Sequence, residues 1–168
     1  MGDSVNTRKF SFGKVAGATS LLLGLLASIV GISAAVIPWY EERHNVNGAW
    51  TLRTLTDKST ETSFTNMELT YTVILTHDGT HVSGKGNKLG EKLGGGTYTP
   101  YEGKARTTIE VDGNLDGNLL NVVITEEGLR RTTTGSLKLK WDGKSWVGTF
   151  YSDAATSSGT AKLSPSGQ

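Results

Sequence analysis

Residues 68–87 read ELTYTVILTHDGTHVSGKGN, and this stretch indicates the fold. Apolar side chains occupy every second position of Glu68–Thr76, as in a strand with one buried face. The Asp78-Gly79 pair then favours a tight hairpin, because both residues readily adopt positive φ. We therefore expect a second strand from His81 to about Asn87, paired antiparallel with the first.

The same pattern continues on both sides of this hairpin. Turn signals at Asp116-Gly117, Glu127-Gly128 and Asp142-Gly143 separate further alternating runs, while residues 57–66 and 88–104 read as longer loops. The other expected strands cover residues 49–56, 105–115, 118–126, 129–141, 145–152 and 159–163. Eight strands joined by hairpins predict an all-β domain over residues 45–164, an eight-stranded antiparallel up-and-down barrel. Such a barrel is filled by side chains or holds one small ligand.

Composition narrows the partners of this domain. Four of the 17 basic and three of the 16 acidic residues precede residue 46, which leaves 13 of each in the barrel segment. A neutral domain has no electrostatic footprint for a nucleic-acid polymer, although a few local cations can still hold a small anionic ligand. The chain has no cysteine, which excludes disulfides and thiolate chemistry.

A long apolar segment precedes the barrel. Val15–Ile37 has 23 residues and no charge, and a helix of this length is roughly 34 Å long, enough to cross a bilayer. Trp39-Tyr40 and the charges that follow are typical of a membrane interface. We predict an N-terminal tail at 1–14 and one transmembrane α-helix at 15–40. A cleaved signal peptide is the alternative, although its apolar region is normally shorter.

One side of this predicted helix carries small residues. They recur at three-, four- and seven-residue steps, a pattern that lets two helices approach closely in lipid. We predict a homo-oligomer formed through the helix and its small residues Gly17, Gly24, Ser28, Gly31 and Ala35.

The charges beside the helix give a weak indication of orientation. Three basic residues precede it (Arg8, Lys9, Lys14) and two follow soon after (Arg43, Arg53). By the positive-inside rule this favours a cytoplasmic N-terminus and an external barrel.

The sequence contains no motif for catalysis. It has no phosphate-binding loop and no Gly-x-Ser-x-Gly elbow, and it has 3 histidines in total. We expect neither an enzyme nor a resident metal or cofactor.

Inward-facing polar residues are the best candidates for a ligand site. Arg131 and Thr133 share a strand face with Leu137 and Trp141, so Arg131 is expected in the barrel or its mouth. A guanidinium there requires an anionic partner, either Glu126 of the preceding strand or a ligand phosphate. The predicted ligand-binding residues are Arg131, Thr133, Tyr71 and Trp141, with the aromatic rings as platforms for a base.

The order of parts resembles the membrane-anchored β-barrel effectors of bacterial anti-phage systems that respond to cyclic oligonucleotides. The features that carry the resemblance are 15–37, Gly48-Ala49-Trp50, the hairpin 77–86, 113–119 and 146–150. This resemblance implies a barrel on the cytoplasmic side of the bacterial inner membrane that senses a cyclic nucleotide. Binding would drive oligomerisation, and the membrane lipid bilayer would be disrupted. That family typically has two membrane spans, whereas this chain shows one.

A second interpretation is a membrane-tethered binding or inhibitor barrel without a signalling role. The Gly48-Ala49-Trp50 opening is similar to the first-strand Gly-x-Trp of lipocalins and avidins, and the charge bias favours the external side.

Overall fold

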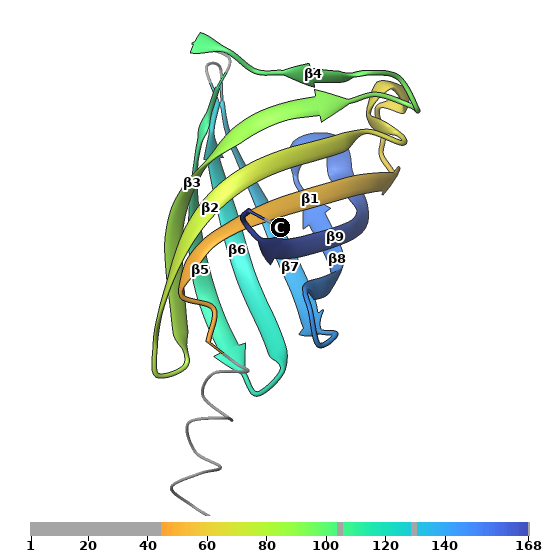
Figure 1. Cartoon of the computed structure of the whole chain (residues 1–168). Coiled ribbons are helices and arrows are strands. Elements are labelled where there is room, and N and C mark those ends of the chain that lie inside the picture. The colour runs from red at the N-terminus through yellow and green to blue at the C-terminus, as the bar shows by residue number, and fades with distance from the viewer. Residues whose placement is uncertain (1–44, 104–105, 129–130, 168) are drawn as a thin grey trace, which may run out of the picture. The chain divides into compact units, whose positions relative to one another are not determined.

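The computed structural model describes residues 45–103, 106–128 and 131–167. The predicted tail and membrane helix lie outside these residues, and the described part contains no helix long and apolar enough to cross a membrane. It contains nine strands and two short 3₁₀ turns (Figure 1). Their bounds are β1 Gly48–Lys58, η2 Thr62–Phe64, β2 Glu68–Asp78, β3 His81–Lys92, β4 Tyr98–Pro100, β5 Thr108–Asp116, β6 Leu119–Glu127, β7 Thr132–Trp141, β8 Trp146–Ser152, η4 Ala154–Thr156 and β9 Ser157–Pro165.

Eight of these strands form a closed antiparallel barrel, as the sequence predicts. Consecutive strands pair around the ring from β1 through β3 and then from β5 to β9. Pairing of β1 with β9 closes the ring, with Trp50 opposite Pro165. The closed ring leaves none of its eight strands as a free edge.

The bounds of several strands differ from the sequence prediction, and the largest differences concern β3 and β4. β3 continues to Lys92 instead of ending near Asn87, because its backbone pairs with β2 as far as Glu68. The short β4 lies in the region predicted as a loop and pairs with the end of β3, outside the ring. Backbone pairing therefore orders a segment whose side chains show no strand pattern.

One end of the barrel is filled by apolar side chains. It is the end where the chain enters at Asn45 and where the turns after β2, β5 and β7 lie (Figure 1). The indole of Trp50 donates a hydrogen bond to the backbone oxygen of Val46 at 2.8 Å. The buried side chains that pack at this end include Val46, Trp50, Val82, Leu115, Leu120, Leu139, Trp146 and Leu163.

The inward-facing residues become polar toward the other end. On β6 the inward series runs Leu120, Val122, Ile124 and then Glu126. On β1 it runs from Trp50 and Leu52 to two buried threonines. Apolar packing therefore closes one end of the barrel, and polar side chains surround the other.

Glycines inside the strands allow close approach of neighbouring backbones. A Cβ on Gly86 would lie 2.0 Å from the backbone oxygen of Thr72 on β2 and 2.9 Å from the Cα of Val73. No side chain fits there without moving the β2–β3 pair.

We expect Gly86→Ala to lower the free energy of unfolding by about 1–3 kcal/mol or more, because backbone must shift to admit the methyl group. Chemical denaturation of the full-length chain measures the change. Asn87→Ala, at the next and exposed position of β3, is the matched control. Equal stability of the two variants would contradict the close approach seen here.

Candidate ligand-binding site

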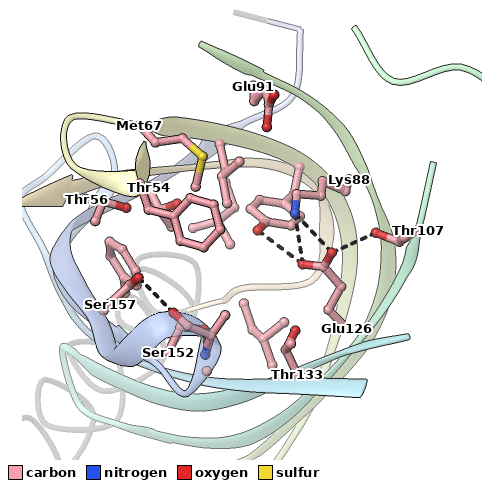
Figure 2. Close-up of a pocket in the computed structure, with 18 of the residues that line it drawn as sticks. Thr54, Thr56, Met67, Lys88, Glu91, Thr107, Glu126, Thr133, Ser152 and Ser157 are labelled. Carbon is pink, nitrogen blue, oxygen red and sulfur yellow. Dashed lines mark hydrogen bonds and ion pairs between the residues drawn. The ribbon is translucent and has the colours of Figure 1, made fainter. Parts of the chain in front are cut away.

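A cavity of about 470 Å³ occupies the polar end of the barrel (Figure 2). It reaches the surface, since Arg131 and Tyr151 are among its lining residues and are exposed. Its volume lies in the range of small-molecule sites in proteins. The residues that line the cavity include Leu52, Thr54, Thr56, Phe64, Met67, Leu69, Tyr71, Lys88, Glu91, Tyr101, Thr107, Ile124, Glu126, Arg131, Thr133, Leu137, Phe150 and Ser157.

A polar cluster on one wall is centred on the Glu126 carboxylate. Lys88 Nζ lies 3.0 Å from Glu126 Oε1 and 3.4 Å from Oε2. The hydroxyl of Thr107 donates to Oε1 at 2.9 Å, and that of Tyr71 lies 3.5 Å from Oε2. These four residues come from β2, β3, β6 and the residues before β5, so the cluster joins separate parts of the ring.

The ammonium group of Lys88 is held between two aromatic rings. Its Nζ lies 5.9 Å from the ring centroid of Tyr71 and 5.6 Å from that of Tyr101, within the range of cation–π attraction. The Lys88 and Glu126 side chains are 16% and 18% exposed, so this pair is much better shielded than a surface ion pair. The hydroxyl of Tyr101 in turn donates to Glu91.

Burial raises the pKa of Tyr71 well above its ordinary value, and the nearby negative charge of Glu126 adds to the shift. Tyr71 is therefore a neutral donor in the folded barrel. A folded-state pKa above the unfolded value means that the stabilisation is complete below about pH 10 and is lost as pH rises further.

We expect Tyr71 to add no tyrosinate absorbance near pH 10 while the barrel is folded. Alkaline titration at 295 nm of the wild type and of Tyr71→Phe should then superimpose until the protein unfolds. The same pair in denaturant is the control and should differ by about half a tyrosinate at pH 10, where an ordinary tyrosine is half ionised. A difference of that size in the folded protein at the same pH would contradict the buried hydrogen-bonded position.

Three of the four predicted ligand-binding residues line this cavity, namely Arg131, Thr133 and Tyr71. Arg131 lies at the exposed rim, just before β7. The suggested ion pair between Arg131 and Glu126 is not formed, because Lys88 occupies the position beside the carboxylate.

Trp141 does not line the cavity. It lies at the end of β7 beside the turn to β8, and its ring centroid is 5.3 Å from that of Trp146. It therefore packs at the filled end of the barrel.

Sequence reasoning missed Lys88, whose charged side chain lines the cavity. The sequence predicts Lys88 at the start of a loop, yet it continues the inward series Val82, Gly84, Gly86 along β3. The two inward threonines of β1, Thr54 and Thr56, share the parity of Trp50 and Leu52. Parity within the predicted strand 49–56 identifies the two threonines, and carrying the parity of β3 one inward position beyond Gly86 identifies Lys88.

Comparison with protein-family models, curated proteins and solved structures found no match.

The arrangement is suited to binding. It combines a shielded ammonium, a rim guanidinium, two carboxylates, hydroxyls and aromatic faces around one space. Ammonium and guanidinium groups hold anions, and aromatic faces stack against flat rings. A ligand with both an anionic group and a ring system matches these features.

Proposed function

We propose that this barrel is the sensor of a membrane-anchored effector and that its ligand is a cyclic nucleotide. The observation that carries the proposal is the 470 Å³ cavity with Lys88 on its wall and Arg131 at its rim. In this proposal the protein is not an enzyme. Ligand binding is the signal that it receives, and oligomerisation transmits that signal to the membrane.

The two cations support an anionic ligand. The Lys88 ammonium has three donors, and among the described residues its hydrogen bonds go to Glu126 alone. At least one donor therefore remains for a group in the cavity. Arg131 has no ion pair with any described residue, and a guanidinium grips phosphate with two parallel hydrogen bonds.

The aromatic residues support a ligand that contains a base. Phe64, Tyr71 and Phe150 line the same cavity as the two cations. Stacking of a base on an aromatic side chain contributes about 1–3 kcal/mol per base. A phosphate near Lys88 and a base against these rings use both parts of the lining.

The membrane part of the proposal rests on the sequence. Residues 15–40 are apolar enough for one span, and small residues on one side suit self-association. Following the family resemblance, we place the barrel on the cytoplasmic side of a bacterial inner membrane, against the weak charge bias. Binding drives assembly and membrane disruption only if the ligand favours the assembled state. The outcome is anti-phage defence.

A second candidate function is a tethered carrier of an apolar ligand. Leu52, Met67, Leu69, Ile124 and Leu137 line much of the same cavity, as in barrels that hold apolar molecules. The two candidates differ in whether binding depends on the Lys88 charge.

The first test measures the melting temperature of the full-length chain in detergent with a panel of cyclic di- and trinucleotides. A ligand at 100 times its dissociation constant adds about 2.7 kcal/mol, or several degrees for a protein of this size. We expect one nucleotide to give such a shift and Lys88→Met to remove it.

Lys140→Met, an exposed lysine on β7 outside the cavity, is the control and should keep the full shift. Absence of any shift in the folded wild type would refute nucleotide sensing. A shift that survives Lys88→Met would place binding elsewhere.

The second test addresses signalling. Gly24→Ile with Gly31→Ile should abolish ligand-dependent growth arrest in cells, because bulky side chains prevent close helix approach. Ligand binding by the purified double variant should be unchanged. Growth arrest that persists at equal expression would refute assembly through this helix side.

A further inference from the structure

Two threonines form part of the cavity wall opposite Glu126. Thr54 and Thr56 lie on β1, which is four strands from β6 in either direction around the ring. Thr54 is 6% exposed and Thr56 is 2% exposed. The two residues are two positions apart on the strand, so their Cα atoms are separated by about 7 Å. Figure 2 shows them on one side of the cavity, with Lys88, Thr107 and Glu126 on the other.

Neither of these hydroxyls has a hydrogen-bond partner among the residues that the structure describes. The hydroxyl of Ser157, on neighbouring β9, differs in this respect, since it bonds to Ser59 and to the backbone oxygen of Ala154. Around Thr54 and Thr56 the lining includes Phe64 and Met67, which offer no strong acceptor. Thr54 and Thr56 line the cavity, so their hydroxyls are free to bond to a group that enters it.

On the opposite wall, the Glu126 carboxylate has its hydrogen-bond partners within the protein. The Glu126 carboxylate already accepts from Lys88, Thr107 and Tyr71, so its hydrogen-bonding capacity is largely used within the protein. The cavity therefore has a charged side, where Lys88 is paired with Glu126, and an uncharged side with the hydroxyls of Thr54 and Thr56. A ligand that is anionic at one end and neutral but hydrogen-bonding at the other matches both sides.

We infer that Thr54 and Thr56 are specificity-determining residues that bind an uncharged hydrogen-bonding edge of the ligand, a base edge or sugar hydroxyl, while its phosphate lies at Lys88. This inference rests on the proposed function and adds to it the way the ligand is oriented. A hydroxyl both donates and accepts, so the pair selects nucleotides over anions with purely apolar bodies.

The test replaces both hydroxyls by methyl groups of the same shape. The full-length Thr54→Val, Thr56→Val variant is compared with the wild type for melting temperature without ligand, affinity for the cyclic nucleotide that binds best in the panel, and affinity for anilinonaphthalene sulfonate. This last probe has an anionic group and an apolar body. The matched control is Thr149→Val with Thr160→Val, two exposed threonines paired on the outer face of β8 and β9.

We expect the double variant to melt at or above the wild-type temperature and to bind the nucleotide roughly 10- to 100-fold more weakly, since each neutral hydrogen bond contributes roughly 3- to 10-fold. Its affinity for the sulfonate probe should be unchanged or higher. The control variant should bind both probes like the wild type.

Two results overturn the inference while leaving nucleotide sensing intact. One is unchanged nucleotide affinity in the double variant. The other is a melting temperature below that of the control, which would show that the hydroxyls support the fold. If the wild type binds no nucleotide, the proposed function and this inference both fail, and the two kinds of failure are thereby distinguished.

Discussion

Closure of the eight-stranded ring is the constraint on which the rest of the structure depends. Each strand of the ring pairs on both sides, and strict alternation then fixes which side chains face inward. Eight strands leave an interior just wide enough for side chains, so the identity of the inward residues decides whether a level of the barrel is filled or hollow. Indoles and leucines fill it near Trp50 and Trp146, and smaller or polar residues leave space near Thr56 and Glu126.

The polar cluster explains how this hollow end holds a charge. An isolated ammonium inside a barrel would lose hydration at high cost. Glu126 offsets that cost for Lys88, and the rings of Tyr71 and Tyr101 flank the same ammonium. Because the carboxylate is in turn held by Thr107 and Tyr71, the ammonium has a fixed place on the wall. Its position is therefore set before a ligand arrives, which reduces the entropic cost of binding.

The sequence was sufficient to predict the barrel because period-two alternation and Asp-Gly turns are local signals, and a closed barrel follows from their number. It was less informative about the site. Parity shows which face of a strand a residue occupies but not its height along the barrel. It therefore predicts Trp141 as a ligand-binding residue, although the turn after β7 places Trp141 at the filled end. The suggested Arg131–Glu126 ion pair is not formed for another reason: Lys88 reaches the carboxylate from a strand 38 residues away in sequence, and the regular pairing of β2 with β3 places it opposite Tyr71.

The pairing of β1 with β9 has a consequence for biosynthesis. Thr51 and Ser166, whose hydroxyls lie 3.3 Å apart, are separated by 115 residues of chain. The ring therefore cannot close on the ribosome until nearly all of those residues have emerged, and contacts of this range form slowly. Until then β1 presents an unpaired edge, which is an aggregation hazard. A chain cut before β9 would keep every residue on the Lys88 wall and still lack a barrel.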